Sequence, residues 1–164
     1  MPGANEKFFG PIIRAAFVAA GLPGELGMAI AKWESGGTFD PNLRSDPHAT
    51  DEALGGAWGF CQMTFETAQG LGFKGQPQGL RDPQTNAALA AKLCAQNAKR
   101  SKAAFGSDAW VSDVAAAYNS GRIFSDPKLP HVTRDTYVPH VLAYYHEYAQ
   151  LYAAADVCSD TTVA

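Results

Sequence analysis

The chain has 164 residues, which is enough for one domain and short for two. Hydrophobic residues make up 46% and charged residues 18%, a composition that excludes an intrinsically disordered chain. The formal net charge of -3 provides no basic field for nucleic acid, so no nucleic-acid partner is expected.

Apolar residues spaced three and four apart predict helices through most of the chain. The first helix is expected from Pro11, which suits a first helical position, to a cap at Gly21. The second is expected over residues 24–34, because Gly36 and Gly37 stop it. The irregular stretch 38–59 follows, and loops of that length in compact domains are usually functional.

The second half of the chain also reads as helices. A short helix is expected over 64–71 and a longer one over 83–102, where Asp82 is the N-cap and Pro83 the first helical residue. Asp108 is expected to cap the next helix, and the last helix to begin near 135–136. Strand signals are weak, so the fold class is all-α with room for a small β-hairpin within 38–60. We expect one domain over 1–155 and a flexible tail over 156–164.

Several kinds of site and targeting segment are not expected. Cys61, Cys94 and Cys158 are odd in number and far apart, which favours buried free thiols over disulfides or zinc ligands. The histidines lack metal-binding spacing, so no metal or other cofactor is expected. No apolar run is long enough to insert in a membrane, and residues 1–10 have no secretory h-region. We therefore expect synthesis in a cytoplasm without a signal peptide.

Glu34 is a candidate general acid. It lies at the C-terminal end of a predicted helix, where the negative end of the helix dipole disfavours a carboxylate. The neighbouring Trp33 would desolvate it, and both effects raise the pKa of a carboxyl group. A raised pKa is what a general acid needs near neutral pH. Taken alone, Glu34 is better interpreted as a solvated residue at a helix end.

Four sequence blocks give Glu34 a context. They read ESGGTFDPN from residue 34, AWGFCQMT from 57, AAYNSG from 116 and TRDTYV from 133. In this order they resemble the soluble lytic transglycosylase family, which shares its fold with goose-type lysozyme. One such block would be a weak signal, whereas four in order are specific. The resemblance implies a lysozyme-like catalytic domain that acts on peptidoglycan glycan strands.

The resemblance also implies roles for individual residues. Glu34 matches the family's catalytic acid, and Ser35 helps to fix the turn that follows it. The remaining matched positions are substrate-binding ones that line or contact the glycan groove: Ser45, Gln62, Met63, Tyr118, Asn119 and Tyr137. Among them, the Ser45 position contacts the sugar N-acetyl group or a nearby water, and the Tyr137 position points its hydroxyl at the catalytic carboxyl.

The chain departs from the family pattern in a few places. Cys61 stands where the family has a core methionine, and we interpret it as a buried small hydrophobic residue. The segment 46–57 is longer than in most relatives, and Asp135 stands near the usual Glu-Thr pair. None of these changes touches Glu34.

The resemblance implies a mechanism with one carboxyl group. Glycosidases ordinarily use two carboxylates, and the acidic residues that could supply a second one lie in the loop after Glu34: Asp40, Asp46, Asp51 and Glu52. The family does without a second carboxylate, because the substrate's N-acetyl oxygen supports the reacting centre. The muramic acid 6-hydroxyl then attacks and leaves a 1,6-anhydro sugar.

The sequence therefore predicts a lytic transglycosylase that cleaves the β-1,4 bond between N-acetylmuramic acid and N-acetylglucosamine. Two alternatives stay open: a hydrolysing muramidase on the same fold, and a non-catalytic wall-binding or structural virion module. The missing signal peptide leads us to expect a bacteriophage enzyme, either a lysin released through a holin or a virion-borne enzyme. Peptidoglycan is then the expected partner, together with phage tail or virion proteins.

Overall fold

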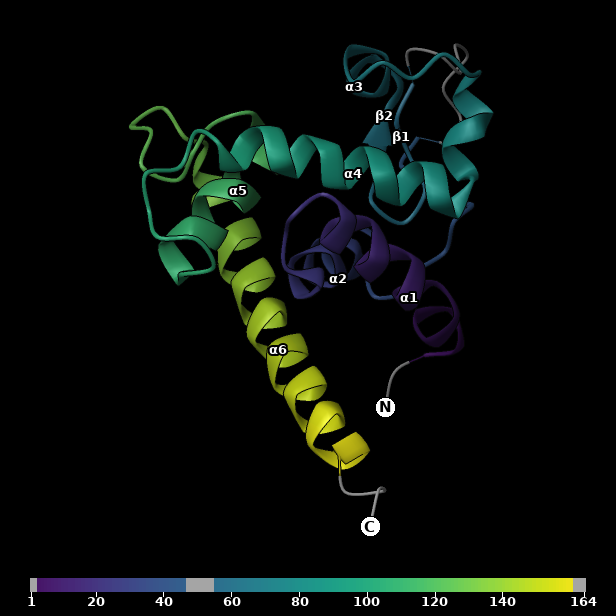
Figure 1. Ribbon diagram of the computed structural model, residues 1–164. Helices are drawn as coiled ribbons and strands as arrows, with labels where there is room; N and C mark the ends of the chain where they lie inside the picture. Colours follow the sequence, from purple (N-terminus) through teal and green to yellow (C-terminus); the bar gives the residue numbers. More distant parts are fainter. Residues whose placement is uncertain (1–2, 47–54, 161–164) are drawn as a thin grey trace.

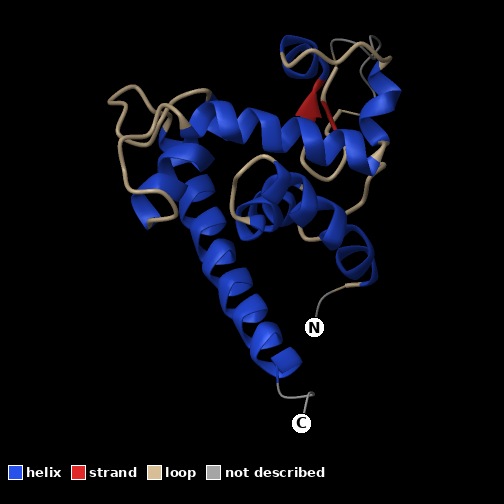
Figure 2. Cartoon of the chain, viewed as in Figure 1, coloured by secondary structure: helices blue, strands red, loops and turns tan. Residues whose placement is uncertain are grey.

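The computed structural model describes residues 3–46 and 55–160, and it describes side chains to residue 154. In chain order the elements are α1 (Ala4–Ala19), α2 (Gly24–Glu34), β1 (Ala57–Trp58), β2 (Met63–Thr64), α3 (Phe65–Gly70), the 3-10 helix η1 (Pro77–Arg81), α4 (Pro83–Ala98), α5 (Asp108–Ser120), the π-helix η2 (Thr133–Tyr137) and α6 (Val138–Asp160). Helices dominate and the two strands are short, which confirms the all-α fold class (Figure 2).

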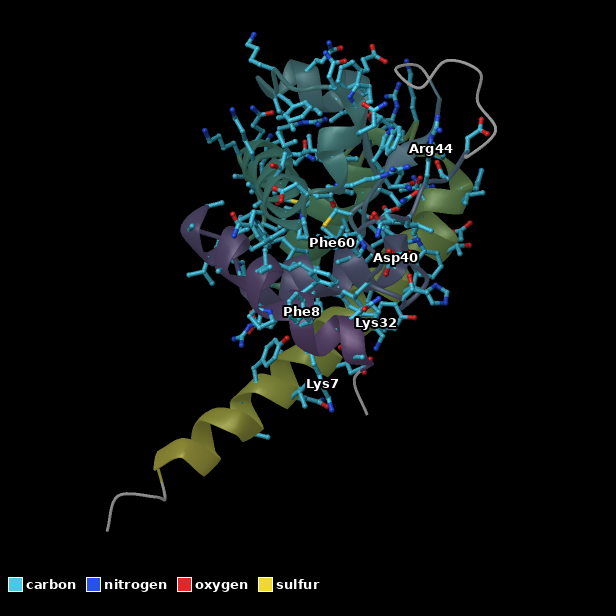
Figure 3. All side chains as sticks on the ribbon, turned by 90° about the vertical axis from the view of Figure 1, so that its right-hand side faces the viewer. Lys7, Phe8, Lys32, Asp40, Arg44 and Phe60 are labelled. Atoms are coloured by element: carbon cyan, nitrogen blue, oxygen red, sulfur yellow. The ribbon has the colours of Figure 1, made fainter. Side chains whose placement is uncertain are left out.

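Helix α2 occupies the centre of the fold. It packs against α1 on one side and α6 on the other, while α4 crosses the body and contacts both α1 and α5 (Figure 1). Fully buried apolar side chains from these helices and from η1 share one core: Ile13, Phe17, Leu26, Ile30, Leu80, Val111, Val114 and Val141. The C-terminal part of α6 projects beyond this body in two perpendicular views (Figures 1 and 3).

The predicted hairpin forms, although later in the chain than expected. Strands β1 and β2 pair antiparallel, with Ala57 opposite Thr64 and Trp58 opposite Met63. Arg44 adds a single bridge to Trp58, so the predicted stretch 38–60 supplies only one side of the pair. The long segment 46–57 falls largely on residues 47–54, which lie outside the described residues.

Two helix starts differ from the predictions. Helix α1 begins at Ala4 rather than Pro11, because the Glu6 carboxylate accepts a bond from the Gly3 N–H at 3.3 Å and caps an earlier turn. Pro11 lies exposed within the helix. Helix α5 is capped by Ser107, whose hydroxyl accepts from the Trp110 N–H at 3.3 Å, so Asp108 is the first helical residue and not the cap.

Two helix ends differ as well. Helix α4 starts at Pro83 under an Asp82 cap, as predicted, but ends at Ala98, since the Ser101 hydroxyl bonds the Asp113 carboxylate at 2.7 Å and turns the chain toward α5. The last helix begins earlier than 135, because η2 leads into α6. It also continues to Asp160, five residues into the predicted tail, because the alanines at 153–155 favour helix. Residues 161–164 lie outside the described residues.

None of the helices in the described part of the chain has the length and hydropathy needed to cross a bilayer.

The contact between α1 and α2 gives a test of the packing. A Cβ atom added at Gly27 would lie 2.5 Å from Cδ2 of Phe17, which is completely buried. We expect Gly27→Ala to lower the free energy of unfolding by about 1–3 kcal/mol, because overpacking outweighs the gain in helix propensity. Gly70→Ala is the matched control, since a Cβ there meets nothing within 4 Å. Urea unfolding measures both, and a Gly27→Ala protein as stable as Gly70→Ala would contradict the expectation.

Candidate active site

Glu34 is the last residue of α2, and the turn at 35–39 fixes where the helix ends. The Ser35 hydroxyl, which is 4% exposed, accepts a hydrogen bond from the Phe39 N–H at 3.0 Å. Gly36 and Gly37 adopt left-handed φ values of 58° and 79°, as helix-ending glycines do. Phe39 also has a positive φ of 49°, which its completely buried ring and the Ser35 bond hold in place.

The Glu34 carboxyl has a raised pKa. Burial raises the pKa from 4.5, the ordinary value of a glutamate, to about 7, and a hydrogen bond from Tyr137 opposes the rise. Burial was one of the causes predicted from the sequence. The predicted neighbour Trp33 packs its ring 4.5 Å from the His140 ring and 6.0 Å from the Tyr137 ring, measured between centroids. The carboxyl is therefore protonated much more readily near neutral pH than an exposed glutamate.

Tyr137 is the direct partner of Glu34. Its hydroxyl donates to Oε1 of Glu34 at 2.7 Å, and the side chain is 3% exposed. Tyr137 ends the π-helical turn η2, and π-helical turns are frequent at functional sites. The geometry that the family resemblance implied for Tyr137 is therefore present, with the hydroxyl directed at the carboxyl.

A pocket of about 340 Å³ opens beside Glu34; we call it the Glu34 pocket. It brings together six of the seven predicted site residues: Glu34, Ser45, Gln62, Met63, Tyr118 and Asn119. Tyr137 lies outside the lining, behind the carboxyl. The sequence reasoning assigned no role to the other lining residues, which are Ala57, Thr64, Thr67 and Leu93.

The hairpin side of the pocket carries Ser45 and Gln62. The Ser45 hydroxyl accepts from the Ala57 N–H at 2.7 Å, and the Ser45 N–H donates to the Ala57 carbonyl at 3.1 Å. Gln62 has a left-handed φ of 48°, and its Nε2 donates to the Gly59 carbonyl at 2.8 Å. Met63 is 2% exposed and closes the wall below them. These contacts fix the polar atoms of the wall before any ligand arrives.

Tyr118 connects the pocket to the core. Its hydroxyl donates to the Cys61 carbonyl at 2.6 Å, and burial, the Cys61 thiol and the Glu34 carboxylate all raise its pKa. Cys61 and Cys94 are free thiols with no exposed surface, and burial raises the pKa of both. Neither is a thiolate nucleophile at neutral pH, and Cys61 is the buried small residue that the sequence predicted. The side chain of Cys158 lies outside the described residues.

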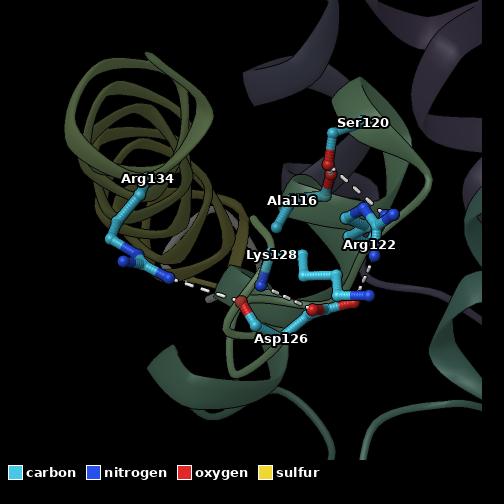
Figure 4. Close-up of polar contacts among 6 residues, drawn as sticks. All are labelled: Ala116, Ser120, Arg122, Asp126, Lys128 and Arg134. Atoms are coloured by element: carbon cyan, nitrogen blue, oxygen red, sulfur yellow. Dashed lines mark hydrogen bonds and ion pairs between the residues drawn. The ribbon is translucent and has the colours of Figure 1, made fainter. Parts of the chain in front are cut away.

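Asn119 joins the end of α5 to η2. Its Oδ1 accepts from the Thr133 hydroxyl at 2.7 Å. Asp126 stabilises the loop that follows α5. Its carboxylate accepts hydrogen bonds from the Arg122 side chain at 3.0 Å and from the Lys128 N–H at 2.8 Å (Figure 4). The Asp126 carbonyl accepts from Arg134 of η2 at 3.3 Å. The segments that carry Asn119 and Tyr137 are thus held together.

The pocket has one carboxylate among the described residues. Of the four candidates for a second one, Asp40 accepts from the Asn42 N–H at 2.8 Å and, like Asp46, does not line the pocket. Asp51 and Glu52 lie outside the described residues. The described residues likewise include no group of three side chains that could hold a metal ion. In the described part of the site, proton transfer at Glu34 is the chemistry that the arrangement offers.

Asn86 in α4 is a contact that the sequence reasoning missed. It is 1% exposed, and its side chain bonds the backbone beside Gln62. A signal was present, because Asn86 shares a helical face with Leu89, Ala90 and Leu93. A polar residue at such a position is expected to be buried and fully hydrogen-bonded.

Comparisons with known proteins found a matching family model and a similar solved structure. The family model described as "Transglycosylase SLT domain" matches residues 11–129. The crystal structure of the 70 kDa soluble lytic transglycosylase from Escherichia coli is similar, with a TM-score of 0.61 and 22% sequence identity. The match covers 85% of this chain and 24% of that protein, and at this identity it shows a shared fold. No curated protein matches the chain.

The Glu34–Tyr137 bond predicts the effect of Tyr137→Phe. The hydroxyl stabilises the charged carboxylate, so its loss should raise the pKa of Glu34 further above about 7. Carbon-13 NMR titration of the glutamate carboxyls measures this pKa directly. The control is Tyr145→Phe, which removes a hydroxyl from α6 away from the pocket. An unchanged or lowered Glu34 pKa in Tyr137→Phe would contradict the assignment.

The raised pKa also predicts how stability depends on pH. Between about pH 4.5 and about pH 7 the folded chain keeps the Glu34 proton that the unfolded chain has released. The free energy of unfolding should therefore fall by about 3 kcal/mol as the pH rises through this window. Because the glutamine cannot ionise, Glu34→Gln should not show this pH-dependent fall in the free energy of unfolding, and it should be more stable than the wild type at pH 8. Equal pH slopes in urea unfolding of the two proteins would rule the linkage out.

Proposed function

The chain belongs to the transglycosylase SLT family, and on that premise we propose that it is a peptidoglycan lytic transglycosylase with Glu34 as its single acid and base. The observation that carries the proposal is the Glu34 carboxyl itself. Its pKa of about 7 suits both proton donation and proton acceptance at neutral pH. It faces a pocket lined by hydroxyl and amide groups of the kind that bind sugars.

The reaction follows from one carboxyl group used twice. Protonated Glu34 donates its proton to the oxygen of the bond between N-acetylmuramic acid and N-acetylglucosamine, and that bond breaks. The positive centre at the muramic acid C1 is supported by the substrate's own N-acetyl oxygen. The Glu34 carboxylate then takes the proton of the muramic acid 6-hydroxyl while the oxygen of that hydroxyl bonds to C1. This step gives the 1,6-anhydro end and restores the protonated form of Glu34.

The surrounding residues support each step. Tyr137 orients the carboxyl by bonding Oε1, and so leaves Oε2 for the substrate. We assign Ser45, Gln62 and Asn119, with Met63 and Tyr118, to the binding of the sugar rings and their N-acetyl groups. Among the described residues that line the pocket, Glu34 is the one carboxylate, which is the number that this route uses.

The test is Glu34→Gln assayed on purified peptidoglycan. We expect turnover to fall by about a hundredfold to ten-thousandfold, the usual contribution of a general acid or base. Asp40→Asn is the matched control, because it neutralises a nearby carboxylate that does not line the pocket, and it should keep wild-type activity. Circular dichroism should show both variants folded.

Product masses separate the proposal from its alternatives. A lytic transglycosylase leaves anhydro ends that are one water lighter than the reducing ends left by a hydrolysing muramidase. Reducing ends alone would show a hydrolysing muramidase in place of the proposed transglycosylase. A Glu34→Gln variant with wild-type turnover would show that Glu34 is not the acid and base. A wild-type chain that binds peptidoglycan without cleaving it would instead be a wall-binding or structural virion module.

The biological setting stays a prediction. The sequence led us to expect a bacteriophage enzyme, either a lysin or a virion-borne enzyme. Mass spectrometry of purified particles distinguishes the two, because only the virion-borne enzyme would be carried in the particle.

A further inference from the structure

Asn86 is a polar residue buried in the core next to the Glu34 pocket. It lies in the first turn of α4, is 1% exposed, and makes three hydrogen bonds to backbone groups. Its Nδ2 donates to the Trp58 carbonyl at 2.8 Å and to the Leu80 carbonyl at 3.0 Å. Its Oδ1 accepts from the Cys61 N–H at 3.0 Å. One side chain thus bonds both sides of the turn at 58–62.

The turn at 58–62 is closed by a bond from the Gln62 N–H to the Gly59 carbonyl at 3.1 Å, and it contains two residues in the left-handed region. It spans a tight reversal in which Gly59 and Gln62 have left-handed φ values of 72° and 48°. A non-glycine residue at positive φ persists only when its surroundings hold it. A Cβ at Gly59 would lie 2.5 Å from Nδ2 of Asn86, so the turn and the amide are packed in direct contact.

The same turn acts on the Glu34 pocket in two ways, through one of its own residues and through a bond to a residue that lines the pocket. Gln62 lines the pocket from the end of the turn, and the Cys61 carbonyl accepts the Tyr118 hydroxyl at 2.6 Å. Asn86 bonds the N–H of the residue whose carbonyl bonds Tyr118. A displacement of the Cys61 backbone would therefore move Gln62 and break the bond of the Tyr118 hydroxyl at the same time.

We propose that Asn86 is a positioning residue for the sugar-binding wall: it sets the 58–62 turn and thereby places Gln62 and the Tyr118 hydroxyl. The proposal rests on the proposed function for its substrate. Asn86 touches neither the pocket nor Glu34. The acid and its partner Tyr137 come from α2 and η2, which Asn86 does not bond. Its loss should therefore weaken saccharide binding more than proton transfer.

Asn86→Ala tests this separation. We expect KM for glycan strands to rise about tenfold, the usual consequence of losing a well-placed hydrogen-bonding contact, while kcat falls by less than about threefold. The part of the activity–pH profile that reports the ionisation of Glu34 should lie at the same pH as in the wild type. Asp82→Ala is the matched control, because it removes the N-cap of the same helix without a bond to the turn. It should lower the melting temperature and leave KM unchanged.

A binding measurement keeps this inference separate from the proposed function. Isothermal titration calorimetry with a soluble N-acetylglucosamine oligomer should give a Kd about tenfold higher for Asn86→Ala than for Asp82→Ala. A wild-type chain that binds the oligomer and does not cleave peptidoglycan would overturn the proposed function and leave this inference standing. KM and Kd of Asn86→Ala within about twofold of those of Asp82→Ala would reduce Asn86 to a stabilising residue and overturn the inference.

A second variant serves if Asn86→Ala does not fold. Gly59→Ala keeps the Asn86 side chain and disturbs its contact with the turn, since a φ of 72° strains an alanine and the new Cβ would overlap Nδ2 of Asn86. It should show the same rise in KM, with the part of the activity–pH profile that reports Glu34 unchanged. A Gly59→Ala protein with wild-type KM and Kd would contradict the coupling between Asn86 and the pocket wall.

Discussion

The hydrogen bond between Tyr137 and Glu34 is the contact on which the candidate active site depends. It spans 103 positions of the chain and joins the end of α2 to η2 at 2.7 Å. Burial raises the pKa of the carboxyl, while the hydroxyl stabilises the carboxylate, so the two effects oppose each other and leave the pKa at about 7. The helical body can be understood as the scaffold that brings these two side chains to one point, because α2 and α6 pack against each other.

Backbone turns, rather than strands, shape the Glu34 pocket around this pair. The 35–39 turn and the 58–62 turn each hold a non-glycine residue at positive φ, Phe39 and Gln62. In each turn a buried polar side chain supplies the backbone bonds, from Ser35 in one and from Asn86 in the other. Such positions are costly unless the surroundings fix them. Both turns are therefore held in place by a buried polar side chain.

Much of this arrangement could be predicted from the sequence, and the rest could not for definite reasons. Periodicity and capping residues predicted α2 and α3 and the start of α4, and the motif blocks selected the residues that line the pocket. The start of α1 was wrong because Glu6 caps a turn that the pattern did not mark, and the end of α4 because Asp113 acts from another helix. The role of Asn86 was missed, since two of its three partners, the Trp58 carbonyl and the Cys61 N–H, lie in the distant 58–62 turn.

The pKa of Glu34 links stability to chemistry. A single group that acts first as an acid and then as a base works best when both of its forms are populated at the working pH, which requires a pKa near that pH. Burial alone would push the pKa higher and leave too little of the base, whereas an exposed glutamate would leave too little of the acid. The Tyr137 hydroxyl, itself 3% exposed, can offset burial because it donates in a site with little water. Burial of the ionised Glu34 carboxylate thus lowers the stability of the folded chain at neutral pH. The same burial favours the protonated form and so keeps a proton available on Glu34.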